Sequence, residues 1–213
     1  MGGRNLWEDG EEQFVTVALK EANAEPECVA GQCVFIDDGQ AFGYDSILSH
    51  RVAPNLLVHG FNPSSRFVRQ VADNLIVNRI RRGICIHQVA LSDKNTTNGY
   101  IEYGAGASLQ TLGKGERVRV TSLDTFVGLH VHPRNYKVAV VKLDIEGSAG
   151  LALRGASDLI ASRQVMTFFI GIHTEAEYSE AASALEAGGY SVTRLVKFSG
   201  SPNSAIIAKL HGP

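Results

Sequence analysis

The most constraining feature of this sequence is an alternation of strand-like and helix-like segments along most of its length. Short apolar runs bounded by turn residues predict strands, and amphipathic stretches between them predict helices. The expected strands are residues 34–36, 56–61, 84–91, 118–120, 138–145 and 165–172. The expected helices are residues 11–24, 44–52, 64–78, 151–162 and 177–187. This order predicts a parallel sheet with helices on both faces.

The last two strand-like segments differ from the others, because only a short turn separates them. Residues 192–198 and 205–210 flank the sequence Ser-Gly-Ser-Pro-Asn at 199–203. Such a turn joins antiparallel strands, so the last strand must run antiparallel. We therefore expect an α/β fold with a doubly wound, mostly parallel seven-stranded sheet and an antiparallel C-terminal strand.

Two regions lie outside this alternation. The helix at 11–24 precedes the first strand and could cap a pocket, so we divide the chain into an N-terminal helical cap (1–33) and a main domain (34–213). Residues 92–117 form a polar, glycine-rich insertion, with a hairpin expected around 100–103. In this topology the insertion lies over the carboxyl ends of the strands, and we expect it to form part of an acceptor pocket, as a lid.

Charge and composition argue against several partners. The formal net charge is -2, which gives no bulk attraction to nucleic acid or to a membrane surface. No apolar run approaches the ~20 residues needed to span a bilayer, and the N-terminus has no apolar signal core. We expect a cytoplasmic protein with no nucleic-acid and no membrane partner, and homodimer formation stays open. A basic cluster of Arg79, Arg81 and Arg82 is expected to be a solvated loop rather than a phosphate-binding patch.

The cysteines give no indication of a metal centre. Cys28 and Cys33 have four residues between them, and the third cysteine, Cys85, is distant in sequence. This spacing does not make a metal site without further ligands nearby. We therefore expect reduced thiols.

The segment from Val34 to Gly43 has the character of a cofactor-binding turn. Asp37 ends an apolar strand, and Gly39 and Gly43 follow before the next helix. An open α/β sheet binds its ligand outside the carboxyl end of such a strand, and glycines let the backbone approach a ligand closely. Asp38 faces the opposite side from Asp37 if the strand continues, so a structural role is expected for it.

Four segments, in this order, resemble the FkbM family of S-adenosylmethionine-dependent methyltransferases. They are residues 34–43 (family V-x-D-x-G-A-N-x-G), 89–93 (A-L-S-D), 120–124 (a strand followed by L-D) and 142–147 (K-I-D-V-E-G), and residues 153–156 then resemble L-R-G-A. The resemblance covers roughly residues 34–175. A parallel sheet closed by an antiparallel strand is also the layout of class I methyltransferases.

This resemblance implies S-adenosylmethionine as the cofactor, held by residues at the ends of strands. They are Asp37, Gly39, Gln40, Gly43, Asn62, Ser92 and Asp93. Asp37 would anchor the amino acid part, Asn62 the ribose, and Ser92 and Asp93 would border the adenine. The family usually has Glu-Pro where this chain has Asn62-Pro63, and an amide lacks the charge-assisted hydrogen bonds of a carboxylate. Ala149 and Gly171 likewise stand where acidic residues are usual.

Three residues are candidates for the chemistry: Asp144, Glu146 and His173. Alternation puts Asp144 and Glu146 on one side of a very apolar strand, and burying unpaired carboxylates there is costly. The alternative is structural, since Lys142 shares their parity and could neutralise them. His173 ends the next strand and suits a general base. These residues could also hold a divalent cation, but no fourth ligand is evident and we assign no metal.

The resemblance implies methylation of a hydroxyl on a small molecule or sugar, although fold does not fix function. A different reading is a degenerate methyltransferase fold kept as a binding module, which Asn62, Ala149 and Gly171 motivate. A nicotinamide-dependent oxidoreductase is disfavoured by the closing hairpin and by the absence of G-x-G-x-x-G. A nucleic-acid methyltransferase is disfavoured by the net charge.

Overall fold

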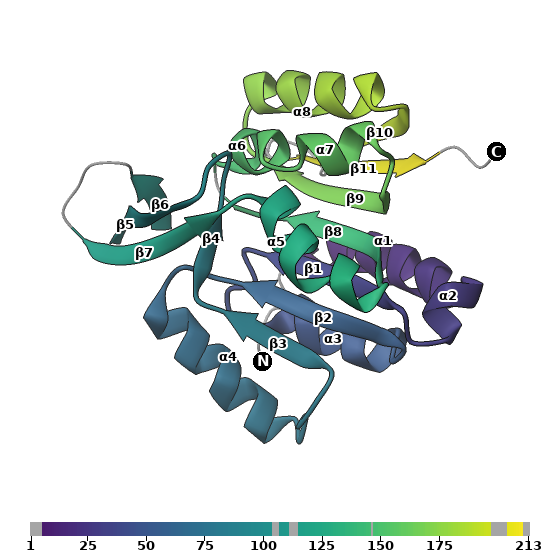
Figure 1. The fold of residues 1–213 in the computed structure, drawn as a ribbon, viewed down its shortest axis with the longest axis horizontal. Coiled ribbons are helices and arrows are strands. Elements are labelled where there is room, and N and C mark those ends of the chain that lie inside the picture. The colour runs from purple at the N-terminus through teal and green to yellow at the C-terminus, as the bar shows by residue number, and fades with distance from the viewer. Residues whose placement is uncertain (1–5, 104–106, 111–114, 146, 197–203, 211–213) are drawn as a thin grey trace.

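A seven-stranded sheet forms the centre of the computed structural model, which describes residues 6–103, 107–110, 115–145, 147–196 and 204–210 (Figure 1). Its strands lie in the order β10-β11-β9-β8-β1-β2-β3. They are β1 (Cys33–Asp38), β2 (Leu56–Phe61), β3 (Ile84–His87), β8 (Lys137–Leu143), β9 (Val165–Ile172), β10 (Tyr190–Val196) and β11 (Ser204–Leu210). Strand β11 pairs antiparallel with β9 and β10, and the other pairs are parallel. The predicted fold class is confirmed.

The chain reverses its direction of travel across the sheet at β1. This strand pairs with β2 on one side and with β8 on the other. Open α/β sheets bind ligands in the crevice outside the carboxyl ends of the strands at such a reversal. The segment that carries Asp37 therefore lies where the sequence pattern placed it.

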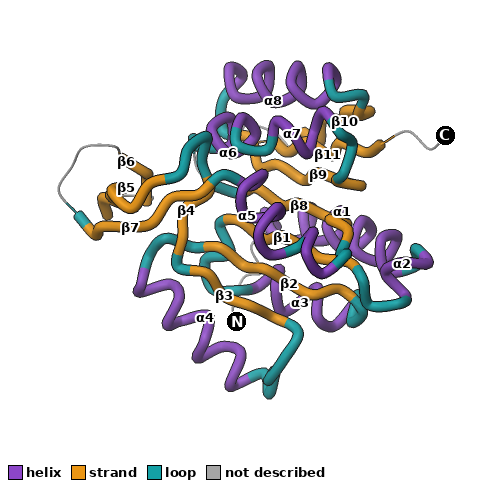
Figure 2. The backbone as a smooth tube through the Cα atoms, viewed as in Figure 1, coloured by secondary structure: helices purple, strands orange, loops and turns teal. Residues whose placement is uncertain are grey.

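Helices pack on both faces of the sheet (Figures 1 and 2). The first four are α1 (Leu6–Asn23), α2 (Pro26–Val29), α3 (Tyr44–Val52) and α4 (Ser65–Val77). The others are α5 (Leu123–His130), the 3-10 turn η1 (His132–Arg134), α6 (Ala149–Arg154), α7 (Ser157–Ala161) and α8 (Glu175–Ala187). No helix among the described residues is long and apolar enough to cross a membrane.

Alternation along β1 divides the core into two clusters. Phe35 belongs to the cluster that includes Leu19 of α1, and Ile36 belongs to the cluster that includes Phe126 of α5. Successive side chains of a strand point to opposite faces, so the wholly apolar start of β1 supplies both clusters. Helix α1 therefore shares a cluster with the sheet. The division of the chain into a cap at 1–33 and a main domain stays a prediction.

The insertion forms a second sheet of four strands. They are β4 (Val89–Leu91), β5 (Thr96–Tyr103), β6 (Ala107–Gln110) and β7 (Glu116–Thr121), in the order β4-β7-β5-β6. Strands β5 and β6 pair antiparallel, with Tyr100 opposite Gln110, which confirms the predicted hairpin. The sheet projects from the main body beside α5 (Figure 1).

Two predicted elements are each divided in the structure. The strand expected at 84–91 becomes β3 and β4, which belong to different sheets. The helix expected at 151–162 becomes α6 and α7, which separate near Gly155. A Cβ at Gly155 would lie 2.0 Å from the carbonyl oxygen of Ser92, so the backbones pack closely there. The turn predicted at 199–203 lies outside the described residues.

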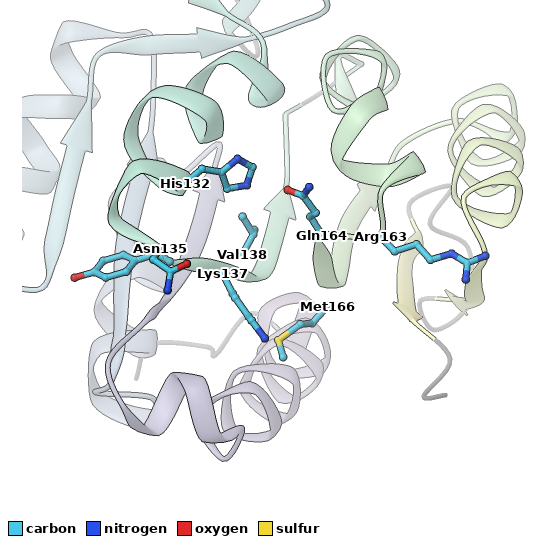
Figure 3. Close-up of a pocket in the computed structure, with 8 residues that line it drawn as sticks. His132, Asn135, Lys137, Val138, Arg163, Gln164 and Met166 are labelled. Carbon is cyan, nitrogen blue, oxygen red and sulfur yellow. The ribbon is translucent and has the colours of Figure 1, made fainter.

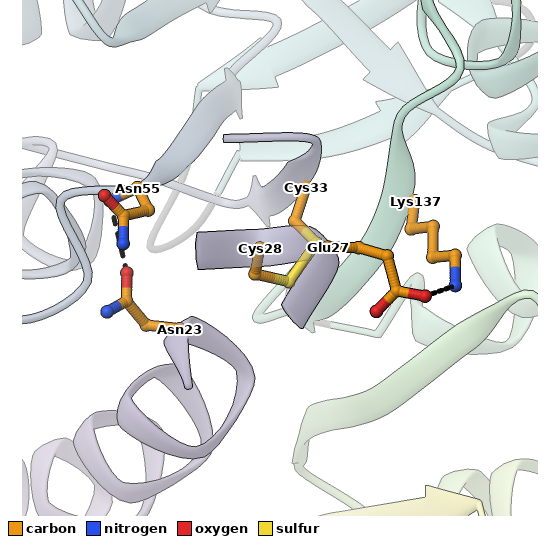
Figure 4. The surroundings of a disulfide bond; sticks show 6 residues. All are labelled: Asn23, Glu27, Cys28, Cys33, Asn55 and Lys137. Atoms are coloured by element: carbon orange, nitrogen blue, oxygen red, sulfur yellow. Dashed lines mark hydrogen bonds and ion pairs between the residues drawn. A yellow bond between two sulfur atoms is a disulfide. The ribbon is translucent and has the colours of Figure 1, made fainter. Parts of the chain in front are cut away.

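A disulfide joins Cys28 to Cys33, and the prediction of reduced thiols is therefore wrong for these two residues (Figure 4). Helix α2 turns the chain back on itself, which leaves the two Cα atoms only 4.8 Å apart. The bridge ties α2 to the first residue of β1, and Cys85 remains a free thiol. An ion pair between Glu27 and Lys137 of β8 holds the same helix.

Candidate functional site

A buried lysine and three carboxylates meet at the carboxyl ends of β1 and β8. Lys142 is the register partner of Asp37 in the adjacent strand, and both side chains are buried. The Lys142 Nζ lies 4.0 Å from Asp37 Oδ1, 3.2 Å from Asp45 Oδ2 and 3.3 Å from Asp144 Oδ2. Asp45 comes from the first turn of α3, so three elements contribute acids around one cation.

Burial dominates the protonation of this cluster. It raises the pKa of Asp37 to about 6, and the nearby charge of Lys142 opposes the rise. Burial, followed by the charge of Asp37, also holds the pKa of Asp38 well above its ordinary value. Burial alone would lower the pKa of Lys142, but the carboxylates around it raise that pKa instead. Lys142 is therefore a permanent cation at neutral pH.

Three buried polar atoms at this turn have no hydrogen-bond partner: Asp37 Oδ1, Asp38 Oδ2 and Gln40 Nε2. The other oxygen of Asp37 accepts a 2.6 Å hydrogen bond from Ser46 Oγ. The Gln40 side chain lies across Gly60, where a Cβ would be 2.2 Å from its Oε1. Buried polar groups are almost always hydrogen-bonded, so three unpartnered atoms on one turn indicate a place for a polar ligand.

The glycines of the turn pack closely against the protein's own chain. Gly39 has a φ of +85°, and a Cβ there would lie 2.1 Å from the carbonyl oxygen of Asp144. Gly43 has a φ of +79°, and a Cβ there would lie 2.8 Å from a methyl of Val71. Both positions need glycine for conformational and steric reasons whether or not a ligand binds. Their predicted contact with a cofactor stays a prediction.

The other predicted cofactor residues lie on neighbouring loops. Asn62 follows β2 and uses its side-chain oxygen to accept a 3.0 Å hydrogen bond from the Ser64 amide. Ser92 is buried after β4, and its hydroxyl donates to Asp93 Oδ1 at 3.2 Å. Asp93 lies 4.0 Å from the Arg154 guanidinium. None of the described hydrogen bonds or ion pairs joins Asn62, Ser92 or Asp93 to Asp37.

The candidate chemical residues separate into two groups, and Glu146 lies outside the described residues. Asp144 belongs to the lysine cluster, and its Oδ1 occupies space over Gly171, where a Cβ would be 2.6 Å away. His173 follows β9 and pairs instead with Glu177 of α8. Its backbone amide donates to Glu177 Oε2 at 2.9 Å, and its Nδ1 lies 3.7 Å from the same oxygen.

The sequence reasoning did not find Asp45, Ser46 or Glu177. Asp45 and Ser46 lie in the first turn of α3, directly after the last glycine of the cofactor-binding turn. Glu177 stands three residues after Thr174, whose hydroxyl accepts a hydrogen bond from the Glu177 amide and caps α8. The Thr-x-x-Glu spacing of a capping box was a visible signal for Glu177. Nothing comparable marked Asp45 or Ser46.

Two other features lie away from this cluster. His59 Nδ1 and His87 Nε2 are 2.9 Å apart on the α5 face of the sheet, and burial lowers the pKa of each to about 4. A cavity of about 510 Å³ is lined by residues such as Lys137 and Gln164 near the amino ends of β8 and β9 (Figure 3). That edge is opposite the one that carries Asp37. Within the described residues, no group of histidine, cysteine or acidic side chains could hold a metal ion.

Known structures of methyltransferases share this fold. No protein-family model and no curated protein matches the sequence. Precorrin-6y C5,15-methyltransferase from Geobacter metallireducens covers 94% of this chain and 89% of its own, with 12% identity and a TM-score of 0.51. The methyltransferase domain of bacterial CtHen1 covers 98% and 100%, with 16% identity and a TM-score of 0.57. SMU.1697c from Streptococcus mutans, solved in complex with SAH, covers 99% and 100%, with 11% identity and a TM-score of 0.56.

These identities are low, and the similarity therefore shows the fold alone. The chain has the class I methyltransferase fold, with its seven-stranded sheet and its antiparallel C-terminal strand.

Proposed function

We propose that this protein is an S-adenosylmethionine-dependent methyltransferase, and that it binds the cofactor at the turn after β1. The observation that carries the proposal is the set of unpartnered buried atoms on Asp37, Asp38 and Gln40 at the reversal of strand order. The fold shared with methyltransferases supports it. The four ordered sequence segments support a place in the FkbM family.

The charge of the site suits this cofactor. S-adenosylmethionine carries an ammonium and a sulfonium, and opposite charges attract strongly where water is excluded. The acids around Lys142 outnumber it, so a cationic ligand would relieve their mutual repulsion. Asp37 would accept from the ammonium through Oδ1, which has no hydrogen-bond partner in the fold, and Gln40 would donate to the carboxylate of the amino acid part. Asn62, Ser92 and Asp93 are proposed for the ribose and adenine.

The acceptor is proposed to be a hydroxyl of a small molecule or sugar. When bound, S-adenosylmethionine supplies an electrophilic methyl group. The chain's own task is to align the acceptor oxygen, exclude water and take the hydroxyl proton. Asp144 is 40% exposed at its side chain and could contact an acceptor directly. His173 is the proposed base, and the hydrogen bond from its backbone amide to Glu177 Oε2 at 2.9 Å holds it at the end of β9. Glu146 is proposed to assist.

Calorimetric titration with S-adenosylmethionine and with S-adenosylhomocysteine tests the cofactor site. We expect Asp37→Asn to weaken S-adenosylmethionine binding by about tenfold to a hundredfold, since a hydrogen bond to a charged group contributes roughly 1.5–3 kcal/mol. The matched control is Asp73→Asn, which removes an exposed acid of α4. Absence of heat and of thermal stabilisation with the folded wild-type protein at millimolar ligand would refute the proposal.

A second function, a binding module on a degenerate methyltransferase fold, is favoured by one observation. Asn62 commits its side-chain oxygen to the loop that follows it, instead of offering a carboxylate to the ribose. Under this alternative, the protein binds neither S-adenosylmethionine nor S-adenosylhomocysteine. If binding is intact, Asp144→Asn and His173→Gln should each lower kcat for a hydroxylated acceptor, and cofactor affinity should stay near the wild-type value in His173→Gln, which lies outside the Lys142 cluster.

A further inference from the structure

The end of α4 and the turn that follows it form an exposed projection with an unusual composition. We refer to residues 76–82 as the α4 tip. Ile76 and Val77 are 74% and 78% exposed, which makes them the most exposed large hydrophobic residues in the described chain. Arg79, Arg81 and Arg82 follow at once and are also exposed. None of the ion pairs among the described residues includes these arginines.

The tip has a defined geometry. The Ile80 amide donates to the Leu75 carbonyl at 2.9 Å, and the Arg79 amide donates to the Ile76 carbonyl at 3.0 Å. These two bonds are the Schellman pattern that ends a helix. Asn78 is held as well, because its side chain accepts from Arg51 at 2.6 Å and donates to the Asn74 carbonyl at 2.9 Å. Ile76, Val77 and Arg79 are thus presented by a fixed turn, and Arg81 and Arg82 follow directly after it.

Arg79 occupies the position where such a turn usually has glycine. Its φ is +59°, in the left-handed region that L-residues enter at a conformational cost. A strained residue in a hydrogen-bonded turn suggests a use for its side chain. Here the side chain adds a third cation to the tip without contributing an ion pair to the fold.

We infer that the α4 tip docks the protein onto an anionic lipid surface, with Ile76 and Val77 entering the headgroup region and the arginines facing lipid phosphates. Each cation near an anionic leaflet adds to the attraction, and exposed aliphatic side chains add apolar area that lipid can cover. Nucleic acid fits less well, because single strands are held by aromatic stacking and the tip has no aromatic residue. Only one acid, Asp73, lies within residues 66–82, against five arginines.

The position of the tip is compatible with a working site elsewhere. One residue, Gly83, separates the tip from Ile84, the first residue of β3, and the tip therefore lies at the amino edge of the parallel strands (Figure 1). Asp37 lies at the carboxyl edge. Docking would therefore leave the proposed cofactor site facing away from the lipid. The net charge of -2 does not reveal this surface, because acids elsewhere in the chain outweigh the arginines.

Co-sedimentation with vesicles tests the inference. The protein of residues 1–213 should bind vesicles of phosphatidylcholine mixed with phosphatidylglycerol and should not bind phosphatidylcholine alone, and added salt should weaken the binding. The triple variant Arg79→Gln, Arg81→Gln, Arg82→Gln should bind about a hundredfold more weakly, at roughly fivefold per cation. The charge-matched control, Lys20→Gln with Lys94→Gln and Arg119→Gln, should bind within about twofold of wild type, because these exposed cations lie elsewhere.

Two further variants separate docking from folding. Ile76→Ser with Val77→Ser should weaken vesicle binding about tenfold or more, whereas Leu129→Ser, at another exposed position, should not. Arg79→Gly should keep or raise the melting temperature, since glycine accepts the positive φ, and yet weaken vesicle binding about fivefold. No binding to anionic vesicles would overturn the inference. Retention on polyuridylate that needs the arginines but not Ile76 or Val77 would also overturn it, in favour of nucleic acid.

Discussion

Lys142 is the residue on which the charge balance of the site depends. It is buried in a strand of the central sheet and lies within 4.0 Å of carboxylates from β1, α3 and the end of β8. An uncompensated buried charge is far more costly than a paired one. The lysine therefore permits the acidic cluster to exist in the folded state, and the cluster in turn keeps the lysine charged.

We predict that Lys142→Met lowers the free energy of unfolding by about 3–5 kcal/mol, as is typical when one partner of a buried ion pair is removed. Methionine approximates the length of the lysine stem, so the loss would report charge rather than volume. Equilibrium urea unfolding measures it. The matched control is Lys137→Met, whose partner Glu27 is at the surface, and only a small change is expected there. Equal midpoints for wild type and Lys142→Met would contradict the assignment.

For single residues, the sequence predicts which side chains share one face of a strand, but it does not predict which groups those side chains contact. Alternation correctly placed Lys142 with Asp144, and the parallel register then brought Asp37 beside them. The partners from helices, Ser46 and Glu177, were missed. Whether a side chain in the first turn of a helix contacts the sheet depends on the angle at which that helix packs. The local sequence period does not predict that angle.

Most individual elements could be predicted, because strand and helix periods depend on local sequence. Helix α3 and strands β2 and β9 have the predicted bounds. The errors occur where distant segments decide. The strand at 84–91 divides because β4 leaves β3 to pair with β7, a partner about thirty residues further along. The helix at 151–162 divides where Gly155 packs on Ser92. Neither contact is visible in a window of ten residues.

The disulfide between α2 and β1 gives a prediction for an element. Cross-linking residues five apart removes conformational freedom from the unfolded chain, which a chain-entropy estimate puts at about 2 kcal/mol. We expect a phosphine reductant to lower the free energy of unfolding by about this amount, measured by urea unfolding. In the double variant Cys28→Ala, Cys33→Ala, the reductant should have no effect. A wild-type protein indifferent to reductant would show that the bridge does not form in solution.

Over the whole molecule, two groups of buried residues respond to acid in opposite directions. The pKa of Asp37 is raised to about 6 in the folded protein, so the folded state binds more protons than the unfolded state between about pH 4 and 6, and acidification stabilises it there. The pKa values of His59 and His87 are lowered to about 4. The unfolded state then binds more protons between about pH 4 and 6.5, and acidification destabilises the fold.

These opposing contributions to stability fall in the same pH range, and substitutions of the individual groups should separate them. We predict that Asp37→Asn makes stability fall more steeply than in wild type as the pH is lowered from about 6.5 to 4, because the stabilising contribution of Asp37 is lost while the opposing contribution of the histidines remains. His59→Gln with His87→Gln should make the fall shallower, since the glutamines cannot take up protons. Urea midpoints across this range measure both slopes.

The ionisation of Asp37 should also control cofactor binding. A cation bound at Asp37 favours the ionised form of its carboxyl group. The affinity for S-adenosylmethionine should therefore rise as the pH is raised through about 6 in wild type, and this rise should be absent in Asp37→Asn. A pH-independent affinity in wild type would place the cofactor's cationic groups away from Asp37.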